Sequence, residues 1–149
     1  MNNMTADMPM KEFLIRKQAC FSQLTDQEIQ ELAGLLTEKN YPSGSTIVVE
    51  GDPVDSVYLI VSGTADVIHQ FIREDDDSIQ SQLLATLGPE TAIGLNETGL
   101  YSLSGKRTAT VVAASDMVLL HLSVARYRGF ELSHTHVKDV MRKHSEDLS

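Results

Sequence analysis

The chain has little cysteine, few aromatic residues and few basic ones, and these shortages exclude several classes of protein. A single cysteine, Cys20, cannot form an intramolecular disulfide or a thiolate zinc cluster, so the sequence predicts a reducing, cytoplasmic location. The 12 Lys and Arg are outnumbered by 21 Asp and Glu, giving a net charge of -9. This balance argues against nucleic acid as a partner, because phosphate backbones are bound by basic surfaces. Any bound anion must be small and held locally.

Long apolar runs are also absent. No stretch approaches the roughly 18 apolar residues that a membrane-spanning helix needs, and the N-terminus "MNNMTADMPMKEFL" lacks the basic and apolar segments of a secretion signal. We therefore expect no contact with a membrane. At 149 residues the chain is long enough to bury one hydrophobic core, which predicts a single domain over residues 1–149.

The first segment, residues 1–39, has a helical pattern from Met8 onward. Thr25 is a candidate N-cap, and Glu28 three residues later completes the sequence of a capping box. The positions that follow repeat an apolar residue at helical spacing: Ile29, Leu32, Ala33, Leu35 and Leu36. We expect an amphipathic helix here.

Residues 40–122 change to a period of two. Short β-rich runs alternate with turn residues: "STIVVE", "SVYLIVSG", "TADVIHQFI", "SIQSQLLATL", "KRTATVVA" and "DMVLLHL". This pattern predicts an antiparallel sandwich or roll. The charged stretch "REDDDS" at residues 73–78 is expected to be a solvated hairpin loop.

The last segment, residues 123–149, is helical again. Ser123 can cap a first helix, and "ELSHTH" breaks the pattern. A final helix carries Val137, Val140 and Met141 on one face, where they are candidate lid or dimer contacts.

The segment "NETGLYSLSGKRTATV" interrupts the β-pattern and holds the candidate site. Residues 97–103 are expected to form a short helix with Asn96 as its N-cap, whose free backbone N–H groups can hold a phosphate. Arg107 can add a charge-assisted contact to the same phosphate. Glu97 would be repelled by a phosphate but can accept a hydrogen bond from a ribose hydroxyl. The set suits a ribose phosphate.

These residues resemble the cyclic-nucleotide-binding domain family, found in the catabolite activator protein, in cAMP- and cGMP-dependent protein kinases and in nucleotide-gated channels. "NETGL" and "RTATV" are similar to the two halves of the family's phosphate-binding cassette, here residues 94–111. The stretch "YPSGSTIVVEGDPVDSVYLIVSGTADV" resembles the family's opening strands, and "FSQLTDQEIQELAGLL" resembles the helix that precedes them. The similarity covers about residues 11–145. The resemblance implies an antiparallel double-stranded β-helix, or jelly roll, of about eight strands flanked by helices.

The resemblance also implies roles for individual residues. Glu97 would accept from the ribose 2′-hydroxyl, and Arg107 would pair with the cyclic phosphate of cAMP or cGMP. The hydroxyl of Thr108 could reach both phosphate and guanine, which slightly favours cGMP. The remaining implied ligand contacts are Asn96, Leu100, Ala109 and the backbone at Thr98 and Gly99, with Val67 and Leu84 as an apolar wall against the base.

Two registers of the cassette are possible. In the first, Asn96 stands where the family has glycine, and Gly99 and Leu100 then match. In the second, Gly94 takes the glycine position, which puts Leu95 in place of the glutamate and makes the cassette degenerate. We prefer the first because it also gives the shorter loop to Arg107.

Three functions compete. The preferred one is a non-catalytic module that binds cAMP or cGMP, needs no other cofactor, and relays binding through its C-terminal helices to a protein partner, to an output domain absent from this chain, or across a homodimer. The alternative is a degenerate domain that serves as a protein-interaction scaffold. A cupin-type metalloenzyme would need His134 and His136 to join His69 and His121 around a metal, but the His-x-His pair lies beyond the last strand, so we predict no metal. No nucleophile motif suggests catalysis.

Overall fold

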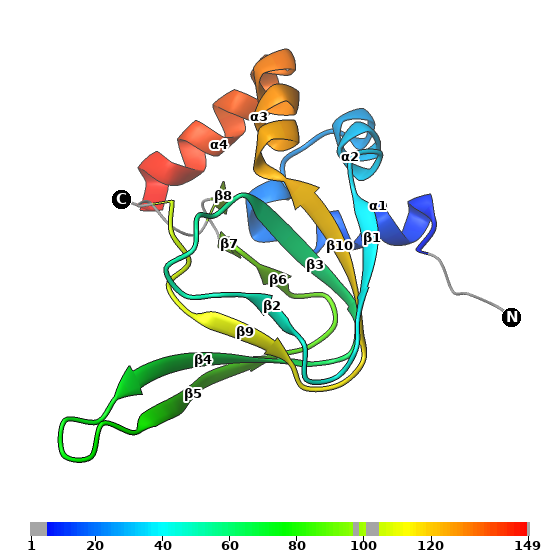
Figure 1. The fold of residues 1–149 in the computed structure, drawn as a ribbon. Helices are drawn as coiled ribbons and strands as arrows, with labels where there is room; N and C mark the ends of the chain where they lie inside the picture. The colour runs from blue at the N-terminus through cyan, green and yellow to red at the C-terminus, as the bar shows by residue number, and fades with distance from the viewer. Residues whose placement is uncertain (1–5, 97–98, 101–104, 149) are drawn as a thin grey trace, which may run out of the picture.

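The structure, a computed structural model, describes residues 6–96, 99–100 and 105–148 (Figure 1). Eight strands form two four-stranded sheets in which every pairing is antiparallel. The first sheet has the order β1 (Thr37–Tyr41), β10 (Met117–Ser123), β3 (Ser56–Ser62), β6 (Ala92–Ile93). The second has the order β2 (Thr46–Val48), β9 (Thr110–Ala113), β4 (Ala65–Ile72), β5 (Ile79–Leu87). This arrangement confirms the predicted antiparallel roll with flanking helices.

A small third sheet was not expected. It pairs β7 (Leu95–Asn96) with β8 (Gly99–Leu100), so that Asn96 stands opposite Gly99. The helix predicted for residues 97–103 is therefore wrong at Gly99 and Leu100, and Asn96 is not a helix cap. Its backbone is already used in a ladder with Gly99, whereas an N-cap must direct its following residues into a helical turn.

The N-terminal segment contains α1 (Met8–Arg16), a short 3-10 helix (Ala19–Phe21) and α2 (Asp26–Ala33). The capping box is confirmed: the Thr25 hydroxyl accepts from the Glu28 N–H at 3.2 Å, and the Glu28 carboxylate accepts from the Thr25 N–H at 2.8 Å. The helix stops earlier than predicted, however. Gly34 caps it, and the chain from Thr37 is extended because it pairs with β10 along five residues.

Strands β3 and β10 are buried on both faces and separate two hydrophobic cores. Their odd and even side chains point to opposite sides, as the period of two requires. The helix-side core includes Leu14, Ile15, Phe21, Ile29, Leu32, Val57, Leu59, Leu120, Leu122, Tyr127, Phe130 and Val137. The roll core, between the two sheets, contains Val48, Tyr58, Ile60, Ala65, Ile93, Val111, Ala113, Met117 and Leu119.

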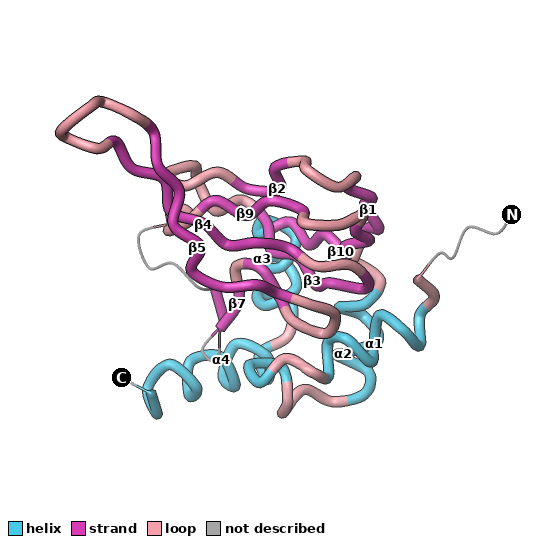
Figure 2. The backbone as a smooth tube through the Cα atoms, turned by 90° about the horizontal axis from the view of Figure 1, so that it is seen from below, coloured by secondary structure: helices cyan, strands magenta, loops and turns pink. Residues whose placement is uncertain are grey.

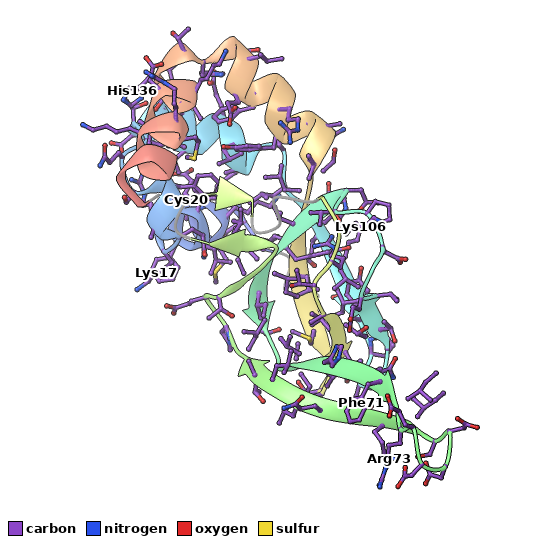
Figure 3. All side chains as sticks on the ribbon, turned by 90° about the vertical axis from the view of Figure 1, so that its left-hand side faces the viewer. Lys17, Cys20, Phe71, Arg73, Lys106 and His136 are labelled. Atoms are coloured by element: carbon purple, nitrogen blue, oxygen red, sulfur yellow. The ribbon has the colours of Figure 1, made fainter. Side chains whose placement is uncertain are left out.

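The helices gather on one side of the roll, and the β4–β5 hairpin projects away from them (Figures 1 and 2). Residues 73–78 form the exposed hairpin tip, as predicted, and Arg73 there pairs with Asp75 at 2.7 Å. Figure 3 places Phe71 and Arg73 near the tip, while Cys20 and His136 lie at the helical end. The thiol of Cys20 is fully buried, and this burial raises its pKa to about 12. It therefore packs as a small apolar side chain.

The C-terminal segment consists of α3 (Val124–Ser133) and α4 (Thr135–Leu148). The Ser123 hydroxyl accepts from the Arg126 N–H at 3.1 Å, and the break falls at His134, as predicted. The role of the final helix as a lid or dimer contact stays a prediction, and in this structure the three apolar residues named for it are buried. They pack into the chain's own helix-side core: Val137, Val140 and Met141.

Candidate functional site

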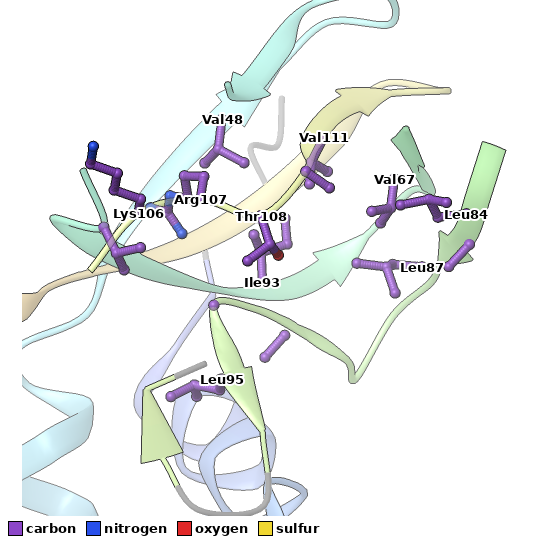
Figure 4. Close-up of a pocket in the computed structure, with 15 residues that line it drawn as sticks. Val48, Val67, Leu84, Leu87, Ile93, Leu95, Lys106, Arg107, Thr108 and Val111 are labelled. Atoms are coloured by element: carbon purple, nitrogen blue, oxygen red, sulfur yellow. The ribbon is translucent and has the colours of Figure 1, made fainter. Parts of the chain in front are cut away.

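A cavity of about 580 Å³ opens between the two sheets (Figure 4). This volume is in the range of small-molecule sites. Most of its lining is aliphatic and comes from β2, β4, β5, β6 and β9, with side chains that include Val48, Val67, Leu84, Leu87, Ile93 and Val111. The polar side chains among the described lining residues are Lys106, Arg107 and Thr108, which precede β9 in the chain. The described cavity thus combines an apolar wall with a positively charged end.

The backbone fixes the position of Arg107. Its N–H donates to the carbonyl of Asp52 at 2.8 Å, and its own carbonyl accepts from the Gly51 N–H at 2.9 Å. The preceding residue, Lys106, forms an isolated bridge with Pro53. The segment that carries both cations is therefore held against residues 51–53, which lie in the connection between β2 and β3.

The Arg107 side chain is buried, with 6% of its surface exposed. Its Nη2 donates to the Ser56 carbonyl at 2.7 Å and lies 3.9 Å from the carboxylate of Asp55. Burial lowers the pKa of Arg107, and Tyr58 and Asp55 partly offset this effect. Arginine nevertheless stays protonated in proteins. Because the Asp55 side chain is 87% exposed, water screens its attraction to this buried cation, and an anion in the cavity would strengthen the neutralisation.

Gly94 lies directly against this arginine. Its φ is +93°, and a Cβ built on it would stand 3.1 Å from Nη1 of Arg107 and 3.0 Å from Cγ1 of Val57. Only glycine adopts this backbone at low cost and leaves this space. Among the residues whose φ the structure describes, non-glycine positions with positive φ are Asp77 and Glu90. Gly94, the glycine of the second register, thus has a backbone conformation that favours glycine.

The structure brings several predicted site residues together. Arg107, Thr108 and Ala109 line the same cavity as the two proposed wall residues, Val67 and Leu84. Of the predicted loop residues, Asn96, Gly99 and Leu100 belong to the paired strands β7 and β8. The other two, Glu97 and Thr98, lie outside the described residues.

Lys106 and Leu95 are among the lining residues that the sequence did not predict as site residues. Lys106 immediately precedes the predicted Arg107, so its charge was a usable signal, and Figure 3 places it beside the roll. Leu95 was weighed only in the rejected register, yet its side chain lines the cavity (Figure 4).

The four histidines that a metalloenzyme would need do not converge. His134 bonds to Glu31, and the Nδ1 of His136 lies 2.9 Å from Glu28, so both join the C-terminal helices to α2. His69 pairs with Glu50 at 2.9 Å on the roll. Among the residues that the structure describes, no three His, Cys, Asp or Glu side chains are grouped as a metal site.

Within residues 6–96, 99–100 and 105–148, no helix is both long and apolar enough to cross a bilayer.

Residues 38–133, well over half of the chain, match the cyclic nucleotide-binding domain family. The chain belongs to this family. It is also 30% identical over 135 residues to the cAMP-dependent protein kinase regulatory subunit of Aspergillus niger, a match that covers 90% of this chain and 29% of that protein. The chain therefore spans less than a third of the length of this curated relative.

Solved structures show the same fold. The N-terminal domain of a transcriptional regulator from Streptomyces coelicolor A3(2) superposes with a TM-score of 0.74 at 24% identity, covering 90% of this chain and 88% of that one. The regulatory domain of Toxoplasma gondii PKA, crystallised with cAMP, gives a TM-score of 0.68 at 20% identity over 87% of this chain and 46% of that chain. At these identities the similarity establishes the fold alone.

Proposed function

We propose that this chain is a non-catalytic regulatory module that binds a cyclic nucleotide, cAMP or cGMP, in the cavity between the sheets. The observation that carries the proposal is the buried cation of Arg107 at the end of an otherwise largely apolar cavity. A cyclic nucleotide has the matching form, because it joins one phosphate charge to a flat base that the wall of Val67 and Leu84 can cover.

The contacts around Arg107 also suggest how binding reaches the C-terminal helices. Its guanidinium donates to the carbonyl of Ser56, and the neighbouring Asp55 carbonyl accepts from the N–H of Val124, the first residue of α3, at 2.9 Å. A phosphate that draws the guanidinium toward the cavity weakens its bond to Ser56 and so disturbs the anchor of α3. Movement of α3 and α4 would then be read by a protein partner, an output domain or a second copy of the chain.

Titration calorimetry with cAMP and cGMP tests the proposal. Arg107→Ala should weaken binding by about 1.5–3 kcal/mol, the scale of a hydrogen bond to a charged group, which corresponds to about 10- to 150-fold in Kd. Arg73→Ala is the matched control, because it also removes one arginine but lies at the exposed hairpin tip. The Arg73→Ala variant should bind each nucleotide with the affinity of the unmodified chain.

Two results would count against the proposal. Equal affinities before and after Arg107→Ala would remove Arg107 from the site. A flat titration with both nucleotides, in a chain whose circular dichroism shows a folded protein, would favour the scaffold function instead.

A further inference from the structure

One face of the projecting β4–β5 hairpin is apolar and exposed. Side chains alternate between the two faces of a strand, and the register places Ile72 opposite Ile79 on the same face. The half-buried Ile68 lies opposite Leu83 on that face as well. Three of the four residues are largely exposed, by 66% at Ile72, 73% at Ile79 and 60% at Leu83. Their apolar surface is on the order of 400 Å², a size at which the patch of a monomeric protein is often an interaction site.

The backbone edge of β5 beside this face is open. β5 stands last in its sheet and, among the described strands, pairs with β4 alone. The Arg73 N–H donates to the Ser78 carbonyl at 2.9 Å. Because hydrogen-bonded and non-hydrogen-bonded pairs alternate along an antiparallel ladder, the backbone groups of Ile79, Ser81 and Leu83 point away from β4. These N–H and C=O groups are a template for a further strand.

Edge strands are usually protected by charge or by proline, and β5 has neither. Its nine residues, "IQSQLLATL", contain no charged side chain and no proline. The adjoining hairpin tip, residues 73–77, is by contrast charged at every position. The register shift of the hairpin lies beyond Leu83, so residues 79–83 run as a regular strand. β5 is therefore suited to pairing through its backbone.

A second copy of this chain matches the edge in its side chains. When two β5 strands pair antiparallel about Ser81, Ile79 of each copy stands opposite Leu83 of the other. The two apolar faces then join into one. The hairpin projects away from the rest of the molecule, so a second hairpin can approach it from the side (Figures 1 and 2).

The charges favour the same arrangement. Residues 73–77 carry one basic and four acidic side chains, and the whole chain has a net charge of -9. Two copies therefore repel each other over much of their surface, and the uncharged β5 is a place where they can meet. Parallel pairing would bring the two acidic tips together. Antiparallel pairing places them at opposite ends of the joined strands.

We propose that β5 is a dimerisation edge, through which two copies pair antiparallel and join their four-stranded sheets into one sheet of eight strands. The two strands and the two apolar faces together bury roughly 1,000 Å², at the lower end of specific interfaces, so the dimer is weak and reversible. This edge is separate from the C-terminal helices, the dimer contact predicted from the sequence. The inference does not depend on nucleotide binding, because Ile72, Ile79 and Leu83 do not line the described cavity.

Sedimentation equilibrium of the full chain without nucleotide, from about 10 µM to about 1 mM, measures this association. The unmodified chain should change from monomer to dimer over this range. Leu83→Lys should raise the dimer Kd at least tenfold, because each dimer would then hold two lysines in its apolar face. Ser81→Pro should do the same, because it removes an N–H that donates across the strand pair while leaving the bonds to β4 intact.

Leu132→Lys is the matched control. It makes the same exchange at a leucine that is 73% exposed, but on α3 at the helical end. The dimer Kd of this variant should equal that of the unmodified chain. Circular dichroism of each variant shows that it is folded, and if Ser81→Pro does not fold, Leu83→Lys decides alone.

Two outcomes would overturn the inference. A chain that stays monomeric at every concentration would refute the dimer and leave the edge to a strand of another protein. A dimer that survives Leu83→Lys but is lost in Leu132→Lys would place the contact on the helices. Neither outcome bears on the proposed function, which calorimetry with Arg107→Ala tests separately.

Discussion

The two cores on either side of β3 and β10 are filled to different degrees. The helix-side core is closed by α1, α2, α3 and α4, and its polar border is paired: Thr25 with Glu28, His136 with Glu28, and His134 with Glu31. The roll core instead adjoins an open cavity that contains the buried cation of Arg107, and the ion pair that the structure describes for this cation is with the exposed carboxylate of Asp55. One side of the same sheet is thus packed by helices, and the other side borders an open cavity with a buried cation, where we propose that a ligand binds.

Two neighbouring residues of β10 test this comparison most strongly. Leu119 and Leu120 are both fully buried, but Leu119 belongs to the roll core and Leu120 to the helix-side core. Replacement by alanine should lower the free energy of unfolding by about 2–5 kcal/mol in each case. Leu120→Ala should lie near the top of that range, because the closed core cannot collapse around the gap.

Leu119→Ala should lie near the bottom of the range, since side chains that border the cavity can move inward. Urea denaturation of both variants measures the difference. A larger loss for Leu119→Ala would mean that the roll core is as tightly filled as the helix-side core. Only Leu119→Ala should also change nucleotide affinity, as its core includes the lining residues Val48, Ile93 and Val111.

A second test concerns the backbone of the cavity. Gly94→Ala should cost about 1–3 kcal/mol of stability, because its φ of +93° strains an L-residue. Its Cβ would also displace the guanidinium of Arg107, so nucleotide affinity should fall as well. Gly44→Ala is the matched control: its φ is +90°, but nothing lies within 4 Å of its Cβ.

Chemical denaturation and calorimetry on both glycine variants separate strain from contact. Gly44→Ala should lose stability alone. An affinity loss of the same size in the two variants would show that backbone strain, and not the approach to Arg107, is responsible.

Local rules predicted the elements whose residues carry their own signals. The capping box at Thr25, the alternation that forms β3 and β10, and the break near His134 all follow from short-range patterns. Strand β1 was missed because "TEKNY" has no alternation, and it is extended only because β10 pairs with it. Tertiary pairing overrides a weak local preference in such a segment.

The candidate site was predictable to a lesser extent. Arg107, Thr108, Val67 and Leu84 were identified and line one cavity. The glycine register was not decided by the sequence, since "GLNETGL" allows either Asn96 or Gly94 at the family's glycine position. What favours Gly94 is its close approach to Arg107, a contact between segments 13 positions apart that spacing alone does not reveal.

A third test uses the pH dependence of stability to probe the histidine–glutamate contacts at the edge of the helix-side core. His134 donates to the Phe130 carbonyl through Nδ1 and faces the Glu31 carboxylate through Nε2, which both raise its pKa above the ordinary value of 6.5. A raised pKa in the folded state means that protonation favours folding. The stabilisation is therefore complete below about pH 6.5 and is lost as the pH rises through the folded-state pKa.

Thermal melts between pH 5 and pH 9 compare the unmodified chain with each variant. Toward alkaline pH, the melting temperature of the unmodified chain should fall relative to that of His134→Gln. The comparison with His121→Gln should show no such alkaline difference. In His121, burial and then the charge of Lys39 lower the pKa, so its effect on stability falls on the acidic side instead. Because His134 joins the turn between α3 and α4 to α2, the loss should be accompanied by loosening of the C-terminal helices, visible as faster amide exchange in α4. Parallel melting curves for the unmodified chain and His134→Gln would mean that the histidine contacts on this border add nothing to the packing of the helix-side core.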